Sequence, residues 1–139
     1  MNDCPFCNSD ERMIYSSEYS FALLSNPRLL VGHTLVIPRR HIEKPWQLRP
    51  EEILDIAMII SRIEQVMLRS GMAEGIDVRQ NYRPFLPQSK TKVNHVHFHV
   101  IPRMNKDALY IESMQFEKFN NLGDDERNRV EEILMQNED

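Results

Sequence analysis

The sequence predicts an α+β domain built on an antiparallel five-stranded sheet, with one long helix and a C-terminal helix. Five short segments are rich in β-branched, aromatic and aliphatic residues, and one longer stretch has helical spacing of its apolar residues. The first strands are joined by short links, whereas parallel strands would need a crossover of a dozen or more residues. A chain of 139 residues suits one domain with its own core, so we expect a single domain over residues 1–139.

The expected strands cover residues 13–16, 21–25, 33–37, 76–82 and 95–101. Turn residues at Asn26-Pro27 and Gly32 separate the early strands, and Pro38 ends the third. In the fifth strand, three histidines alternate with apolar residues: His95, Val96, His97, Phe98, His99 and Val100. Because successive side chains of a strand point to opposite faces, we expect the imidazoles on one face and the apolar side chains against the core.

The long helix is expected from about residue 50 to residue 70. Pro50 suits its first turn, the acidic residues after it complement the helix dipole, and Gly71 suits its end. A second helix is expected over residues 124–135, with its apolar side chains buried. These side chains are Val130, Ile133 and Leu134.

Composition excludes several classes of protein. A net charge of −4 argues against a general nucleic-acid binder, which usually carries a basic stripe. No stretch approaches the roughly 18 apolar residues of a membrane span. Residues 1–20 contain no apolar run typical of a secretory signal, so we expect a cytoplasmic protein whose two cysteines form no disulfide.

The three alternating histidines indicate a reaction centre or a metal site. Histidine serves as a nucleophile, a proton shuttle or a metal ligand near neutral pH, while a merely solvated strand face would more often use Thr, Lys or Glu. One metal held by all three is geometrically poor, because His95 and His99 would lie about 13 Å apart at the Cα atoms of a strand.

Cys4-Pro5-Phe6-Cys7 has the C-x-x-C spacing. A redox motif of this kind follows a strand, and only three residues precede Cys4, so that reading is disfavoured. Half of a zinc site is the alternative, with two further ligands supplied by histidines. His33 and His41 are both open at this point, as ligands or as ordinary structural histidines.

Polar residues flank the histidine-rich segment. Asn81 ends the fourth expected strand, and Gln88, Ser89, Thr91 and Lys92 lie in the loop that follows. Amides, hydroxyls and a cation suit a ribose and phosphates, although an ordinary polar loop would have the same composition.

The segment from His95 to Ile101 matches the H-φ-H-φ-H-φ-φ signature of the histidine triad family of nucleotide hydrolases and transferases. Gly32-His33-Thr34-Leu35-Val36-Ile37-Pro38 and Phe21-Ala22-Leu23-Leu24 resemble the family's N-terminal half. The resemblance covers about residues 4–103 and implies the family's fold. Residues 104–139 form an extension without a recognisable motif.

The resemblance implies a nucleotidyl hydrolase acting on dinucleoside polyphosphates or nucleoside phosphoramidates. His97 would attack the α-phosphorus to form a nucleotidyl-histidine, and His99 would stabilise the phosphate charge. A glutamine at that third position marks the uridylyltransferase branch, so His99 favours hydrolysis. Ser25 and Asn81 would contact the nucleotide, with Gln88, Ser89 or Thr91 near the leaving group. A zinc-held, nucleotide-binding regulatory module with weak catalysis is the alternative.

The zinc-containing branch of the family pairs its C-x-x-C with two histidines. Carried over, a structural zinc would be held by Cys4, Cys7, His41 and His95. Family members are dimers, and a homodimer is expected here because apolar residues surround the long helix, leaving Leu54, Met58 or Ile59 to face water otherwise. The alternative is that residues 109–135 cover this surface within one chain.

Overall fold

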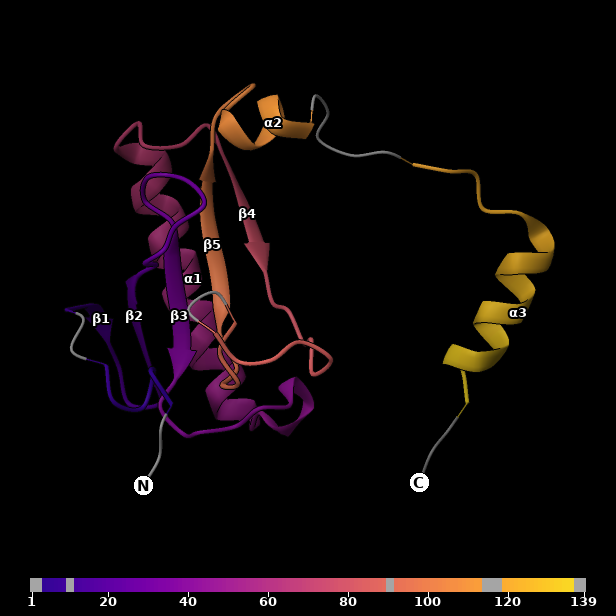
Figure 1. Cartoon of the computed structure of the whole chain (residues 1–139), viewed down its shortest axis with the longest axis horizontal. Helices are drawn as coiled ribbons and strands as arrows, with labels where there is room; N and C mark the ends of the chain where they lie inside the picture. Colours follow the sequence, from indigo (N-terminus) through magenta and orange to yellow (C-terminus); the bar gives the residue numbers. More distant parts are fainter. Residues whose placement is uncertain (1–3, 10–11, 90–91, 114–118, 137–139) are drawn as a thin grey trace.

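A computed structural model describes residues 4–9, 12–89, 92–113 and 119–136. One antiparallel sheet contains β1 (Met13–Ser16), β2 (Ser20–Leu24), β3 (Thr34–Pro38), β4 (Gly75–Arg79) and β5 (Phe98–Arg103). Its spatial order is β1-β2-β3-β5-β4, so the last strand in sequence lies between β3 and β4 (Figure 1). The predicted α+β class and five-stranded antiparallel sheet are confirmed.

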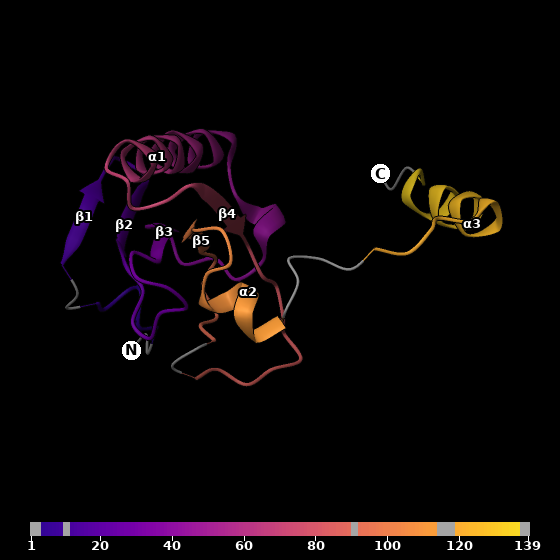
Figure 2. The same cartoon turned by 90° about the horizontal axis from the view of Figure 1, so that it is seen from above.

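The long helix α1 (Pro50–Arg69) lies across one face of the sheet (Figure 2). Its buried stripe of Ile56, Ile59, Ile63 and Met67 packs against sheet residues that include Val36 and Val100. Leu54 and Met58 face outward, 64% and 65% exposed. The expectation that Ile59 would also face water is wrong. Ile59 lies three residues after Ile56 and four before Ile63, which places it on the buried stripe.

The histidine-rich strand begins later than its alternation predicts. β5 starts at Phe98, with His95 in a bend and His97 just before the strand. The segment before β5 leaves the ladder with β3, and the Val96 N–H donates instead to the Ile42 carbonyl at 2.7 Å. Phe98 and Val100 do pack on the α1 side of the sheet, as expected. His99 therefore projects from the opposite face.

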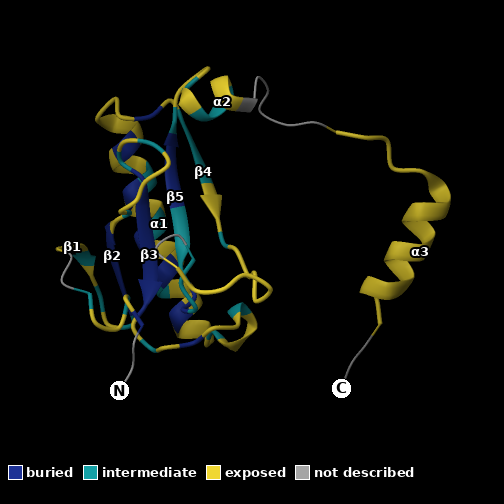
Figure 3. Ribbon diagram, viewed as in Figure 1, coloured by how far each residue is buried: buried dark blue, intermediate teal, exposed yellow. Residues whose placement is uncertain are grey.

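The C-terminal helix α3 (Asp124–Leu134) is present, but its predicted burial is wrong. Val130, Ile133 and Leu134 are 40%, 59% and 77% exposed. Figures 1 and 3 show α3 apart from the sheet and exposed along its length, and none of its residues is buried. Most positions of this helix are charged, so three apolar side chains are all that it offers to a core.

Two short elements were not expected, the 3₁₀ helix η1 (Pro45–Gln47) before α1 and the helix α2 (Ala108–Ser113) after β5. The buried residues are concentrated in β2, β3, β5 and the inner side of α1 (Figure 3). A second apolar cluster on the far face of the sheet contains Phe21, Leu23, Leu35 and Ile37, with Phe6 packed against it. Among the described residues, every helix is too short or too polar to cross a membrane.

Candidate active site and metal centre

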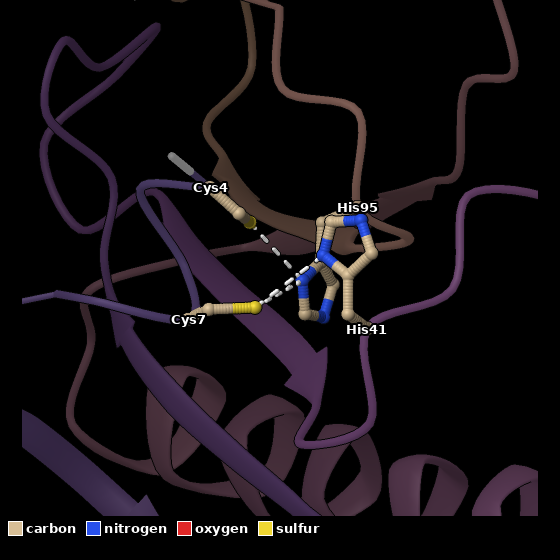
Figure 4. Close-up of side chains that lie close together, drawn as sticks. All are labelled: Cys4, Cys7, His41 and His95. Atoms are coloured by element: carbon tan, nitrogen blue, oxygen red, sulfur yellow. Dashed lines mark hydrogen bonds between the residues drawn. The ribbon is translucent and has the colours of Figure 1, made fainter. Parts of the chain in front are cut away.

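Four predicted metal ligands converge from three separate segments (Figure 4). Cys4 Sγ lies 3.3 Å from His95 Nδ1, and Cys7 Sγ lies 3.3 Å from His41 Nδ1 and 3.6 Å from His95 Nδ1. All four ligand atoms fall within 4.8 Å of one another. Zinc–sulfur bonds of about 2.3 Å and zinc–nitrogen bonds of about 2.0 Å put tetrahedral ligand atoms roughly 3.3–3.8 Å apart. The donor set therefore fits a tetrahedral zinc ion.

Hydrogen bonds behind the ligands fix which imidazole nitrogen faces the cluster. His95 Nε2 donates to the Pro38 carbonyl at 2.8 Å, which leaves the Nδ1 lone pair directed at the two sulfurs. His41 Nε2 lies 3.4 Å from the Glu43 carboxylate, so its Nδ1 is the nitrogen that faces Cys7. Burial lowers the pKa of His95 to about 4 and raises the pKa of the Cys4 thiol. His95 is thus neutral at pH 7, the form that binds metal.

The structure separates the two histidines that spacing alone left open. His41 belongs to the Cys/His cluster, whereas His33 lies at the other end of the histidine row, with its Nε2 2.9 Å from His99 Nδ1. His33 is buried at the end of the turn that leads into β3. Its contact with His99 is a feature that the sequence analysis did not assign. The sequence signal for it was a histidine directly after Gly32, in a segment of strand-forming residues.

The hydrogen bonds of His33 determine the proton positions on His99. The Leu29 N–H donates to His33 Nδ1 at 3.0 Å, so the proton of a neutral His33 resides on Nε2 and is donated to His99 Nδ1. A neutral His99 then carries its own proton on Nε2. Burial is the main cause that lowers the pKa of His99 to about 4, with the charges of His97, His33, Arg79 and Arg83 adding to it. His99 Nε2–H is consequently a neutral hydrogen-bond donor.

His97 has the complementary arrangement. Its Nδ1–H donates to the His95 carbonyl at 2.7 Å, which leaves a lone pair on Nε2. Burial lowers the pKa of His97, so the imidazole is neutral at pH 7. The His97 and His99 rings lie 4.9 Å apart, and the Phe6 ring contacts His97 edge-on at 5.0 Å. A potential nucleophile, His97 Nε2, and a potential hydrogen-bond donor, His99 Nε2–H, therefore belong to neighbouring rings.

The predicted nucleotide-binding residues have different local environments. Ser25 forms its hydrogen bonds in the segment that leads into β3. Its N–H donates to the His33 carbonyl at 2.8 Å and its hydroxyl donates to the Pro27 carbonyl at 2.7 Å. Gln88 Oε1 accepts a hydrogen bond from the Asn94 N–H at 3.1 Å, which ties the loop to the residue before His95.

Asn81 and Ser89 are exposed. Asn81 lies two residues beyond the end of β4, because that strand ends at Arg79 rather than at the predicted residue 82. Ser89 exchanges backbone hydrogen bonds with Lys92, at 2.8 Å and 3.3 Å. Thr91, the other residue considered near the leaving group, lies outside the described residues.

Comparison with known proteins matches this chain to one family. The family model of the HIT domain matches residues 7–106. A HIT-like protein of Methanocaldococcus jannaschii is 32% identical over 129 residues, which are 88% of this chain and 94% of that protein. The bis(5'-adenosyl)-triphosphatase of Dictyostelium discoideum is 31% identical over 113 residues, 78% of this chain and 74% of that enzyme.

A solved structure shares both the fold and the family. It is a zinc-bound histidine triad family protein from Mycobacterium smegmatis, with a TM-score of 0.67 and 30% identity, covering 90% of this chain and 86% of that one. The match of the family model spans Cys7 of the Cys/His cluster, His33 and the whole histidine row. The chain therefore belongs to the histidine triad (HIT) family.

Proposed function

We propose that this protein is a nucleotidyl hydrolase that cleaves dinucleoside polyphosphates or nucleoside phosphoramidates at the α-phosphorus and releases a nucleoside monophosphate. The observation that carries the proposal is the complementary pair of neutral imidazoles, with a lone pair on His97 Nε2 and a proton on His99 Nε2. The Dictyostelium discoideum relative is a bis(5'-adenosyl)-triphosphatase, which supports a substrate of this class.

In the first step, His97 Nε2 attacks the α-phosphorus and the bond from phosphorus to the leaving oxygen or nitrogen breaks. The His95 carbonyl accepts the Nδ1–H of His97 and favours the cationic imidazolium character that develops as the new P–N bond forms. His99 Nε2–H donates to an oxygen of the α-phosphate, where negative charge is held in the transition state. His33 keeps that donor in its required tautomer.

In the second step, water attacks the same phosphorus, the P–N bond breaks, and the nucleoside monophosphate leaves. The imidazole is a good leaving group because the electron pair returns to His97 Nε2, which regenerates the neutral ring. We assign Ser25 and Asn81 to nucleotide contacts and Gln88 or Ser89 to the neighbourhood of the leaving group. Their amide and hydroxyl groups suit contacts to a ribose and phosphates, which supports that assignment.

Zinc is the metal that we assign to Cys4, Cys7, His41 and His95. With four protein ligands the ion would be structural, and its charge would offset the two thiolates. The ligand residues would hold the N-terminal segment beside His95 and, through Phe6, beside His97. Reduced thiolate ligands suit a cytoplasmic location, which we propose with the zinc.

A homodimer is the assembly that we propose. Leu54 and Met58 expose most of their surface on the outer side of α1. Contiguous apolar surface of this kind is commonly covered by a second copy related by twofold symmetry. α3 leaves this surface uncovered within the chain, since none of its own residues is buried.

The proposed mechanism is tested by trapping the covalent intermediate. Wild-type protein is mixed with diadenosine triphosphate, quenched within one turnover, and analysed by intact-mass spectrometry with peptide mapping. An adenylyl group on His97 and release of AMP are expected. His97→Asn should lose both the adduct and several orders of magnitude of turnover.

His33→Asn is the matched control, since it changes a histidine that contacts only His99 in this pair and leaves the nucleophile in place. It should still form the adduct, at a lower rate. A folded His97→Asn protein with near-wild-type turnover would refute the nucleotidyl-histidine mechanism. Wild-type protein that binds the substrate and releases no AMP would favour a binding module instead.

A further inference from the structure

Arg79 projects beside the proposed phosphate-binding histidine. It is the last residue of β4 and pairs directly with His99 of β5. Opposite residues of an antiparallel pair project on the same face, with Cβ atoms about 4.5–5.5 Å apart. The neighbouring pair, Val78 and Val100, faces the other way, and Val100 belongs to the cluster under α1. Arg79 and His99 therefore share the sheet face that α1 leaves open.

A second arginine in the loop after β4 acts electrostatically on the same histidine. Arg83 is exposed and follows Arg79 by four residues. The charges of Arg79 and Arg83 both help to lower the pKa of His99, and that of Arg79 helps to lower the pKa of His33. Both positive charges are therefore within electrostatic range of the proposed reaction centre. They support the placement that the strand register gives for Arg79.

The acidic residue nearest to Arg79 is already engaged by another cation. Asp77 Oδ2 lies 3.5 Å from Arg79, but 2.5 Å from Arg103. Arg103 is the more buried of the two arginines and also binds Asp107 at 2.6 Å. An exposed pair at 3.5 Å contributes little, so Arg79 retains most of its capacity to bind an anion.

We propose that Arg79 and Arg83 form a subsite for the phosphates beyond the scissile bond, and that they make the enzyme selective for polyphosphate leaving groups. The inference rests on the proposed function of His97 and His99. A dinucleoside polyphosphate releases a nucleoside di- or triphosphate, whereas a phosphoramidate releases an amine without phosphate. Guanidinium groups bind phosphate oxygens through paired, charge-assisted hydrogen bonds. They would bind the leaving phosphates and offset the charge that grows on them as the bond breaks.

The test compares two substrates that share the adenylyl group and differ in the leaving group. Arg79→Gln, Arg83→Gln and the double variant are assayed on diadenosine triphosphate and on adenosine 5'-phosphoramidate. A charge-assisted hydrogen bond supports an expected fall of about 10- to 100-fold in kcat/KM for diadenosine triphosphate. The phosphoramidate should change by less than about twofold, because its leaving group makes no contact with the subsite.

Arg129→Gln is the matched control, since it removes the same charge from the exposed helix α3 and should change neither substrate. Equal losses on both substrates, or no loss on diadenosine triphosphate, would overturn the inference. Inorganic tripolyphosphate binding, measured by calorimetry, separates this result from the proposed function. If the wild-type protein binds tripolyphosphate and the double variant does not, the subsite is supported, even if neither substrate is hydrolysed. A failure to hydrolyse either substrate would overturn only the proposed hydrolase function.

Discussion

Replacing Glu52 tests the connection between α1 and the segment that carries the proposed metal ligand His41. The Glu52 side chain is 3% exposed. Its carboxylate accepts hydrogen bonds from Arg40 at 2.8 Å and 3.2 Å, and from the Arg49 N–H at 2.8 Å. Arg40 directly precedes His41, so one buried carboxylate joins the first turn of α1 to the end of β3.

Glu52→Gln keeps the shape of the side chain but removes its charge and turns one acceptor into a donor facing the guanidinium. Breaking a fully buried ion pair lowers the free energy of unfolding by about 3–5 kcal/mol. Arg40 is 36% exposed and can be rehydrated, which reduces the expected loss to about 2–3 kcal/mol. For a chain of this size, that loss corresponds to a fall of about 10 °C in Tm.

Urea denaturation followed by circular dichroism measures the difference, with Glu51→Gln as the control. Glu51 is an exposed acid in the same helical turn, and its loss should cost only about 0.3–1 kcal/mol through the helix dipole. The hydrogen bond from Arg40 holds the pKa of Glu52 below its ordinary value of 4.5. The stabilisation is therefore present above pH 4.5 and is lost as the pH falls through the lower folded-state pKa. Two variants with equal stability at pH 7 would refute this reasoning.

Three further predictions concern the metal, the assembly and the response to acid. Elemental analysis should find one zinc per chain in the wild-type protein, and Cys7→Ser should lose it and melt at a lower temperature, because metal binding is coupled to folding; unchanged zinc would contradict the assigned ligands. Met58→Glu should shift the mass measured by light scattering from about twice 16.5 kDa to 16.5 kDa, and a wild-type mass of 16.5 kDa would contradict the dimer. The pKa of His99 falls from an ordinary 6.5 to about 4 in the fold, so its contribution to stability is present above pH 6.5 and is lost as the pH falls toward 4. His99→Asn should flatten the pH dependence of unfolding in that window, and an unchanged slope would exclude this role.

The sequence predicted those parts of the fold that depend on local pattern. The β-branched, aromatic and aliphatic residues of β1 to β3, Pro50 at a helix start and helical spacing up to Met67 are properties of neighbouring residues, and the structure has the elements that they predict. Burial of Val130 in α3 was wrong because an amphipathic pattern shows that a helix has an apolar side, but not that another element covers it.

The site was predictable where residue type alone limits the chemistry. Two cysteines and a row of histidines predicted the Cys/His cluster, and Cys4 does meet His95 across 91 residues of chain. The break in the strand at His95 was not predictable, because it depends on the Pro38 carbonyl, a group far away in sequence. The partnership of His33 with His99 likewise depends on the pairing of β3 with β5.

β5 is hydrogen-bonded on both sides, to β3 and to β4. The amides of the histidine row are therefore expected to fall into two groups with different rates of hydrogen exchange. The amides from Phe98 onward lie in the centre of the sheet, so their hydrogen exchange should require opening of the whole domain. His97 precedes the ladder and is held by side-chain contacts and one bond to the His95 carbonyl. Its amide should exchange through smaller, local openings. In the proposed mechanism, the phosphate donor His99 would thus be fixed to the rigid scaffold, while the nucleophile His97 would be free to follow the phosphorus during the two displacements.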